Sequence, residues 1–211
     1  GHSRRALPGA RVASVTWPTV PLFPLSTVLF PDGPLPLRVF EPRYLDMVSR
    51  CLRHDEEFGV VLIVGGTDTA EVETSTVGTL ARIIDWYQGS DGILGIPAQG
   101  TRQFCLHAVS RQADGLYLGE AEPLPEMLSQ PLPEEFRALS TLLASVIEDL
   151  GRLYDAVPKR YDDAAWVGCR LAEILPMPAA DKQRCLEFVD PLERLQFLRP
   201  MVRPVRRVKT K

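Results

Sequence analysis

The 211-residue sequence predicts an α+β fold, in which a twisted N-terminal β barrel or sheet with one helix precedes a C-terminal α-helical bundle. Short apolar runs bounded by Gly, Asp or Pro fill the first half, a pattern typical of strands and turns. A proline-rich stretch at 123–133 then changes the composition. Beyond it, apolar residues recur at the spacing of amphipathic helices. These three observations divide the chain into two structural parts.

The expected boundaries follow these changes in composition. Gly1 stands where an initiator Met would be, so the first residues look like a remnant of recombinant expression. We expect five segments: that remnant with a flexible N-terminus at 1–16, a β domain at 17–122, a proline-rich crossover at 123–133, a helical bundle at 134–200, and a basic flexible tail at 201–211.

The β domain is predicted from its apolar runs, taken in chain order. Pro42 opens the single helix, expected at 42–54, because proline is tolerated where the first N–H has no helical partner. Strands are predicted at 20–23, 36–40, 58–64, 80–87, 93–96, 104–109 and 116–119. Their spacing suits a barrel-like sheet.

The second part is predicted from helical periodicity. A long amphipathic helix is expected from Phe136 to Tyr154, after two glutamates that suit a helix N-terminus. Asp162 and Asp163 open a second helix, and shorter helices are expected at 179–188 and 191–198. Each of these apolar stripes needs a partner, so a compact antiparallel bundle is predicted.

The run from Val20 to Tyr44 is the most informative part of the sequence. It reads Val-Pro-Leu-Phe-Pro-Leu-Ser-Thr-Val-Leu-Phe-Pro-Asp-Gly-Pro-Leu-Pro-Leu-Arg-Val-Phe-Glu-Pro-Arg-Tyr. Three more segments follow in order: Gly78-Thr-Leu-Ala-Arg-Ile83, Gly100-Thr-Arg-Gln-Phe104, and a closing segment from Leu175 to Leu195. Together they cover nearly the whole chain, which closely resembles the Lon protease N-terminal domain.

The resemblance implies a PUA-like β domain, a helical bundle and a recognition surface for unfolded or tagged polypeptide. Full-length enzymes of that family add ATPase and Ser-Lys protease modules. No Gly-x-x-x-x-Gly-Lys-[Ser/Thr] loop is present, and of four lysines only Lys182 is a candidate dyad base. A solvated helix face is the favoured interpretation of Lys182. We therefore expect no catalytic residues, no cofactor and no enzyme activity.

Composition and net charge limit the kinds of partner that we expect. The net charge of −3 makes nucleic acid an unlikely partner, and no stretch has the apolarity of a signal peptide or membrane span. The four cysteines are widely spaced, so buried thiols are favoured over a metal site. We expect a cytoplasmic, bacterial protein that works with a separate protease or chaperone, with homo-oligomerisation left open.

Two segments are candidates for contact with polypeptide. Val28, Leu29 and Phe30 are consecutive apolar residues in an irregular loop, so some of them are expected to line a groove. A groove between the two domains would accept hydrophobic side chains of an unfolded segment. Trp86 and Tyr87 could form an exposed aromatic platform, although core packing of one of them is the favoured alternative.

The remaining signature residues are predicted to be structural. A Glu41–arginine clasp between the strand-to-helix turn and a neighbouring strand would fix the sheet's register, whereas a carboxylate anchor for a peptide terminus would need one arginine left free. The glycines are expected to shape the barrel. The structural set is Phe23, Pro24, Phe40, Glu41, Arg43, Tyr44, Gly78, Gly100 and Arg102.

Two other functions stay open from the sequence. The PUA-like kinship allows an RNA-binding module, which would need a basic, aromatic face and salt-dependent binding. A small-ligand binder or cryptic enzyme would need titratable groups facing one pocket. The recognition module is preferred because four motifs support it.

Overall fold

The computed structural model describes residues 4–6, 16–66 and 71–202. The chain divides into two compact units, 1–126 and 127–211, which are described separately. The predicted tail at 201–211 lies outside the described residues from position 203 onward, as do positions 1–3 and 7–15 of the predicted flexible N-terminus.

The first unit consists of strands and one helix. In chain order these are β1 (Arg4–Ala6), β2 (Thr19–Leu25), β3 (Pro34–Val39), α1 (Pro42–His54), β4 (Phe58–Gly65), β5 (Glu73–Thr74), β6 (Val77–Ile83), β7 (Tyr87–Gln88), β8 (Leu94–Arg111) and β9 (Tyr117–Pro123).

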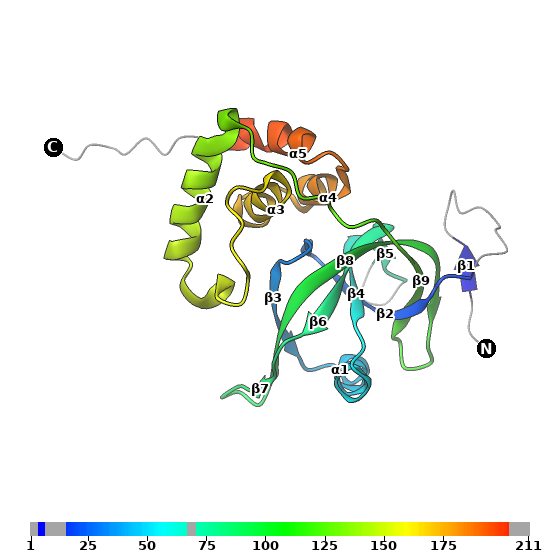
Figure 1. Ribbon diagram of the computed structural model, residues 1–211. Helices are drawn as coiled ribbons and strands as arrows, with labels where there is room; N and C mark the ends of the chain where they lie inside the picture. The colour runs from blue at the N-terminus through cyan, green and yellow to red at the C-terminus, as the bar shows by residue number, and fades with distance from the viewer. Residues whose placement is uncertain (1–3, 7–15, 67–70, 203–211) are drawn as a thin grey trace. The chain divides into compact units, whose positions relative to one another are not determined.

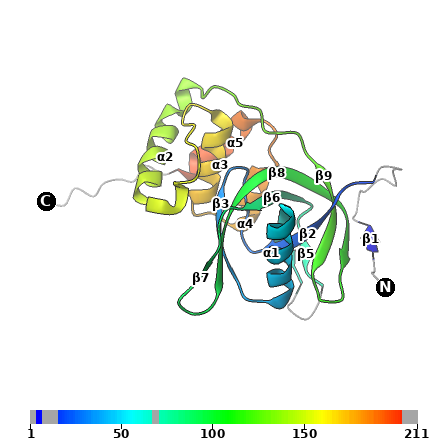
Figure 2. The ribbon, with the colours of Figure 1, turned by 60° about the horizontal axis from the view of Figure 1, so that its bottom comes forward.

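The sheet of the first unit closes on itself. Hydrogen-bonded neighbours follow the order β8, β6, β4, β2, β9, and β9 pairs again with β8. The β2–β4 pair is parallel, whereas the other pairs in this ring are antiparallel. Figures 1 and 2 show β8 curving along the barrel to reach partners on both sides. Closure leaves the ring without a free edge.

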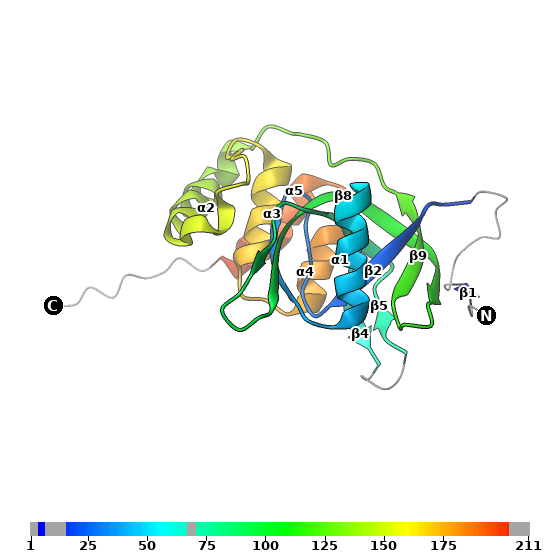
Figure 3. The ribbon, with the colours of Figure 1, turned by 90° about the horizontal axis from the view of Figure 1, so that it is seen from below.

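Helix α1 lies across one end of the barrel (Figure 3). It begins at Pro42, as predicted, and presents Tyr44, Met47, Val48 and Cys51 to the apolar core. These positions recur three and four residues apart, so they share one helix face. Alternate residues of β3 also enter this core, which is the pattern of a strand with one buried face.

The strands differ from the prediction in four places, and the first is the unpredicted short strand β5, which pairs with β4. The predicted strand 80–87 is interrupted, because β6 ends at Ile83 and the chain resumes pairing only at β7. Two predicted strands, 93–96 and 104–109, are one continuous strand, β8. Finally, Arg4–Ala6 pairs with β8 within a segment predicted to be flexible.

Gly100 lies inside β8, which pairs with β3 and β6 on either side of it where the sequence suggested a break. A Cβ atom at this position would collide with the carbonyl oxygen of Phe30, so only glycine allows the two backbones to approach. The Gly100 amide donates to Gly33 O at 2.8 Å, and its carbonyl accepts from Asp32 N at 2.8 Å. The loop after β2 is thereby fastened to β8.

The second unit is helical among its described residues. Its elements are η1 (Glu134–Phe136), α2 (Arg137–Asp149), η2 (Gly151–Tyr154), α3 (Ala164–Ile174), α4 (Ala179–Glu187), α5 (Pro191–Leu198) and η3 (Arg199–Met201). Asp163 and Asp190 cap α3 and α5 by accepting backbone N–H groups at 3.1 and 2.9 Å. Helix α3 is almost entirely buried and packs against α2, α4 and α5.

The long helix predicted from Phe136 to Tyr154 is broken. Gly151 adopts a φ of 64°, a left-handed conformation that ends α2 and leaves a separate 3₁₀ turn behind it. Ile147 and Tyr154, on either side of this position, are buried, whereas Leu150 and Leu153, which extended the predicted apolar stripe across it, are exposed. Periodicity alone could not reveal the break.

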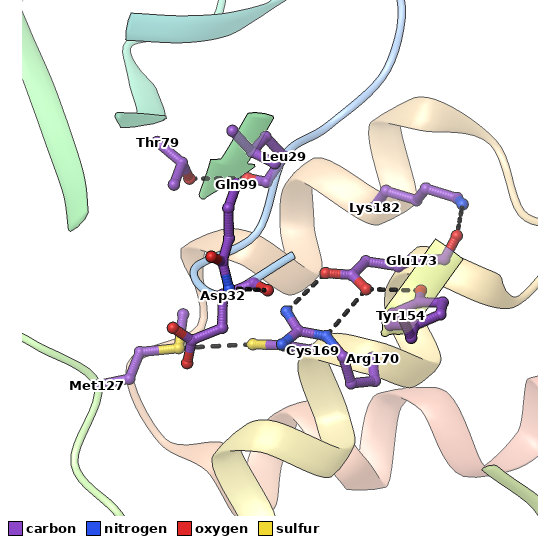
Figure 4. Close-up of polar contacts among 10 residues, drawn as sticks. All are labelled: Leu29, Asp32, Thr79, Gln99, Met127, Tyr154, Cys169, Arg170, Glu173 and Lys182. Carbon is purple, nitrogen blue, oxygen red and sulfur yellow. Dashed lines mark hydrogen bonds and ion pairs between the residues drawn. The ribbon is translucent and has the colours of Figure 1, made fainter. Parts of the chain in front are cut away.

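A buried ion pair joins two residues of α3 inside the second unit (Figure 4). Arg170, which is fully buried, donates to both carboxylate oxygens of Glu173 at 2.9 and 2.6 Å. Tyr154 adds a hydroxyl donor to the same carboxylate at 2.9 Å. Lys182 donates to the Glu173 carbonyl oxygen at 2.6 Å, and burial lowers its pKa. Lys182 is therefore half-buried rather than on a solvated face.

The proline-rich segment 123–133 is tied down at both ends. Leu124 N donates to Gln103 O at 2.9 Å within the first unit. Gln130 N donates to the Asp163 carboxylate at 3.1 Å and Leu132 N donates to Asp162 O at 2.8 Å within the second. The expected crossover thus contributes to both units.

Within the described residues, no helix combines the length and apolarity needed to cross a membrane. The same part of the chain holds no group of three or more His, Cys, Asp or Glu side chains arranged for a metal ion.

Candidate functional site: a cavity at the strand ends of the first unit

A cavity of about 560 Å³ opens where several strands of the first unit end. We call it the barrel-end cavity. It is lined by the last residues of β2, β3, β4 and β8, by the first residue of β9, and by the start of α1. Its lining residues are Phe23, Pro24, Leu25, Leu37, Arg38, Val39, Phe40, Glu41, Arg43, Tyr44, Ile63, Val72, Arg111 and Tyr117.

One wall of the cavity is aromatic. The rings of Phe23 and Tyr44 stack with their centroids 4.1 Å apart, and burial raises the pKa of the Tyr44 hydroxyl. Phe40, by contrast, is 66% exposed, although it directly follows the buried strand residue Val39. An exposed phenyl ring beside a buried aromatic pair offers apolar surface to a ligand.

Three arginines line the same cavity. Arg38 forms an ion pair with Asp91. Arg43 places Nε and Nη2 at 3.1 and 2.9 Å from one oxygen of Glu41. Arg111 has no carboxylate partner among the described residues; it lies 5.2 Å above the ring of Tyr117 and donates Nε to Gly115 O at 3.3 Å. Within the part of the chain that the structure describes, one positive charge of the cavity therefore has no acidic partner.

Gly115 organises two of these arginines. Its carbonyl oxygen accepts from Arg43 Nη1 at 3.5 Å as well as from Arg111. Its φ is 92°, in the left-handed region, and a Cβ atom there would lie 3.0 Å from Arg43 Nη1. The turn therefore favours glycine, and a Cβ atom there would press on the guanidinium group of Arg43.

The side chains that line the cavity are mainly apolar, aromatic and cationic, with one carboxylate. Among its described lining residues there is no His, Cys, Ser or Lys that could act as a nucleophile or proton carrier near neutral pH. The Tyr117 hydroxyl accepts from Val72 N at 3.0 Å, so it is engaged by the backbone. Apolar surface and a guanidinium group are what remain for a ligand.

The loop residues predicted to line a groove are buried. Val28, Leu29 and Phe30 are 8%, 4% and 0% exposed. The Leu29 carbonyl accepts from the Thr79 hydroxyl at 2.7 Å (Figure 4), which anchors the loop to β6. The expectation that irregular backbone would leave some of them open was wrong in this structure, because the loop folds inward. Their contact with polypeptide stays a prediction.

The aromatic platform lies on the surface. Trp86 and Tyr87 are 59% and 55% exposed, so the alternative of core packing for one of them was wrong. Tyr87 covers Gly95 of β8, where a Cβ atom would collide with the phenol ring. Neither residue lines the barrel-end cavity, and their role in binding stays a prediction.

The Glu41 pair is local. Glu41 binds Arg43, two residues away in the same turn, and both guanidinium nitrogens approach one carboxylate oxygen. The expected clasp to a neighbouring strand was therefore wrong. Arg102, the other candidate partner, donates instead to Leu124 O at 2.8 Å. Gly78 is buried in β6, where a Cβ atom would collide with the Val60 carbonyl.

Several cavity residues were missed from the sequence. Arg111 and Tyr117 lie at the two ends of the β8–β9 turn, nearly seventy positions after the signature run. The signal that could have found them is Asp114-Gly115 between two apolar runs, a hairpin pattern that places flanking residues side by side. Phe23, Pro24, Phe40, Glu41, Arg43 and Tyr44, predicted as structural, all line the cavity.

The first unit is thus a closed barrel with an apolar, arginine-bearing cavity. Comparison with known families identifies the chain, because a family model described as the ATP-dependent protease La (LON) substrate-binding domain matches residues 19–203. The chain belongs to this family.

Relatives and solved structures are consistent with that assignment. The Lon protease of Xanthomonas oryzae pv. oryzae is 26% identical over 91% of this chain, and this chain spans about a quarter (24%) of its length. Protein cereblon of Danio rerio is 30% identical over 58% of this chain and 28% of its own.

Among solved structures, a Lon N-terminal domain protein from Xanthomonas campestris is 36% identical, with a TM-score of 0.72 over 87% of this chain and 98% of that one. The N-terminal domain of a Mycobacterium avium complex Lon protease, at 18% identity and a TM-score of 0.59, shows the fold alone.

Proposed function

We propose that this protein is a non-catalytic recognition module that binds unfolded or tagged polypeptide in the barrel-end cavity. The observation that carries the proposal is that residues of the signature run line an open cavity and that one of them, Phe40, is exposed there. A phenylalanine that served only the fold would be expected to pack inward. Membership of a substrate-binding family supports the same direction.

The proposal extends to the protein's place in the cell. We assign the closed barrel to the PUA-like class and the second unit to a helical bundle. The module would work in the cytoplasm as an adaptor or regulator of ATP-dependent proteolysis, with a separate protease or chaperone supplying the catalytic step. The Lon proteases among its relatives support that context.

Binding by a single cavity is expected to be weak. Burying three apolar side chains gains roughly 5 to 9 kcal/mol, whereas association costs an estimated ~4 to 15 kcal/mol. Useful affinity would come from oligomerisation or from delivery to a partner that raises the effective concentration.

The test is a titration of the purified protein with a fluorescent casein fragment, monitored by anisotropy. Saturable binding is expected for the wild type, and Phe40→Ser is expected to weaken it about tenfold by removing exposed apolar surface. Val189→Ser is the matched control, since Val189 is 95% exposed and belongs to the second unit. Equal loss in both variants, or no casein binding at all, would contradict the proposal.

Single-stranded RNA at two salt concentrations tests the main alternative. Two of the three cavity arginines are paired with carboxylates, so a basic stripe for phosphates is missing from this site. Salt-sensitive RNA binding would reverse the assignment. If neither casein nor RNA binds, a small molecule becomes the expected ligand.

A further inference from the structure

We propose that the barrel-end cavity binds the free C-terminal carboxylate of a polypeptide that ends in an apolar residue, with Arg111 as the carboxylate-binding group. This inference rests on the proposed function and names the part of the polypeptide that is recognised. Three features of the cavity support it: its charge, the orientation of the Arg111 guanidinium group and the exposed apolar side chains.

The charge of the cavity selects an anionic group. Of its three arginines, Arg38 is neutralised by Asp91 and Arg43 by Glu41, while Arg111 has no carboxylate within 4.0 Å among the described residues. Glu41 is the only acidic residue of the described lining, and Arg43 already occupies it. A ligand that brings one carboxylate would balance this cavity, whereas a neutral ligand would not.

The guanidinium group of Arg111 is oriented before such a ligand binds. Its Nε is fixed by the Gly115 carbonyl and its guanidinium plane lies over Tyr117, so two interactions already orient the group. The two terminal nitrogens have no acceptor among the described residues. An oriented guanidinium loses less conformational freedom on binding, and it can donate two parallel hydrogen bonds to one carboxylate.

Apolar surface adjoins this cation in the same cavity. Phe40 and Ile63 are 66% and 37% exposed, and Leu25 is half-buried beside them. The last residue of a chain carries its side chain and its carboxylate on one Cα atom, so it is the smallest unit that satisfies both features. A Glu or Asp side chain would need a second residue to supply the apolar group.

The test uses three peptides of one sequence, labelled at the N-terminus and ending in Leu-Phe. The first has a free C-terminal carboxylate and the second a C-terminal amide. The third is also an amide but has glutamate in place of the penultimate leucine. We expect the free acid to bind at least tenfold more tightly than the amide, and the glutamate peptide to behave like the amide. Raising the salt concentration should weaken only the free acid.

Arg111→Gln tests the assigned residue. It should bind the acid and the amide equally, whereas Arg82→Gln, an exposed arginine of β6 outside the cavity lining, should keep the preference. Unchanged far-UV circular dichroism and urea midpoint would show that Arg111→Gln is folded. If it is not, the acid-to-amide comparison on the wild type decides without a variant.

The failures are distinguishable. Casein binding with no preference for the free acid would overturn the terminus proposal and leave the recognition module standing. Recovery of affinity by the glutamate peptide would also overturn it, in favour of a side-chain carboxylate. A wild type that binds neither casein nor any peptide would remove both proposals.

Discussion

The rings of Phe23 and Tyr44 stack almost in parallel, with 10° between their planes and 4.1 Å between their centroids. Phe23 belongs to β2 and Tyr44 to the first turn of α1, so the contact joins the barrel to the helix across its end. Both residues also line the barrel-end cavity. Core packing and the shape of the cavity therefore depend on the same pair.

Removing one ring of this pair should destabilise the first unit. Phe23→Ala is expected to lower the free energy of unfolding by about 3 to 5 kcal/mol, because a buried ring is lost and the site cannot fully collapse. Urea denaturation measures the change. Phe23→Leu, which keeps most of the apolar volume, should cost less, and equal losses for the two variants would contradict the packing argument.

Gly115 and Gly92 provide a matched pair for the arginine arrangement. Both have a left-handed φ, 92° and 80°, so an alanine at either position should cost roughly 1 to 2 kcal/mol of backbone strain. A Cβ at Gly115 meets Arg43, whereas nothing lies within 4 Å at Gly92. We expect similar urea midpoints for both variants but weaker binding of the free-acid peptide only for Gly115→Ala. Equal affinities would show that Gly115 does not position the arginines.

The buried pair in the second unit should behave unlike an exposed pair of the same spacing. Glu173→Gln leaves Arg170 buried beside a neutral group, so a loss of about 3 to 5 kcal/mol is expected. Glu134→Gln breaks an i, i+3 pair with Arg137 on the surface, where solvent screening should leave the urea midpoint nearly unchanged. Urea denaturation of both variants makes the comparison. The double variant Arg170→Met/Glu173→Leu should recover part of the larger loss.

Two buried thiols should make the protein less stable in mild alkali. Burial raises the pKa of Cys51 and of Cys185 to about 11. The unfolded chain loses these protons near about pH 8.5 while the folded protein keeps them, so this contribution to stability is complete below the unfolded pKa and is lost as the pH rises towards 11. The urea midpoint should fall between about pH 8 and 9.5, below the ordinary tyrosine range.

The control for that experiment is the Cys51→Ala/Cys185→Ala variant. Its absolute stability will be lower, since it creates cavities, but its midpoint should change less over the same pH interval. A decline as steep as that of the wild type would assign the effect to other groups.

Local sequence determined much of the fold. Pro42 and the apolar stripe from Tyr44 to Cys51 predicted α1 with its observed bounds, because capping and periodicity are properties of neighbouring residues. Asp163 likewise marked the start of α3. Where the prediction was wrong, distant contacts decided: β8 continues through Gly100 because β3 and β6 pair along it from Leu94 to Cys105, which no window of neighbouring residues can reveal.

The candidate site was only half visible for the same reason. Ten of its lining residues belong to the signature run, and six of these were singled out from the sequence, but as structural. Arg111 and Tyr117 reach the cavity because pairing of β8 with β9 brings them side by side. Phe40 has the same side chain as a core phenylalanine, and only its exposure in the structure distinguishes it. Exposure and charge pairing are properties of the folded structure. The sequence alone therefore could not distinguish a binding role of these residues from a packing role.

Closure of the barrel also has a consequence for biosynthesis. Thr19–Leu25 needs Tyr117–Pro123 as its second neighbour, nearly one hundred positions further along the chain. A nascent chain leaving the ribosome would hold this early strand with one side unsatisfied until the last strand had been translated. Such an open side is a place for mispairing between chains. The proline residues at positions 21 and 24, which cannot donate backbone hydrogen bonds, would limit that risk while the ribosome finishes the barrel.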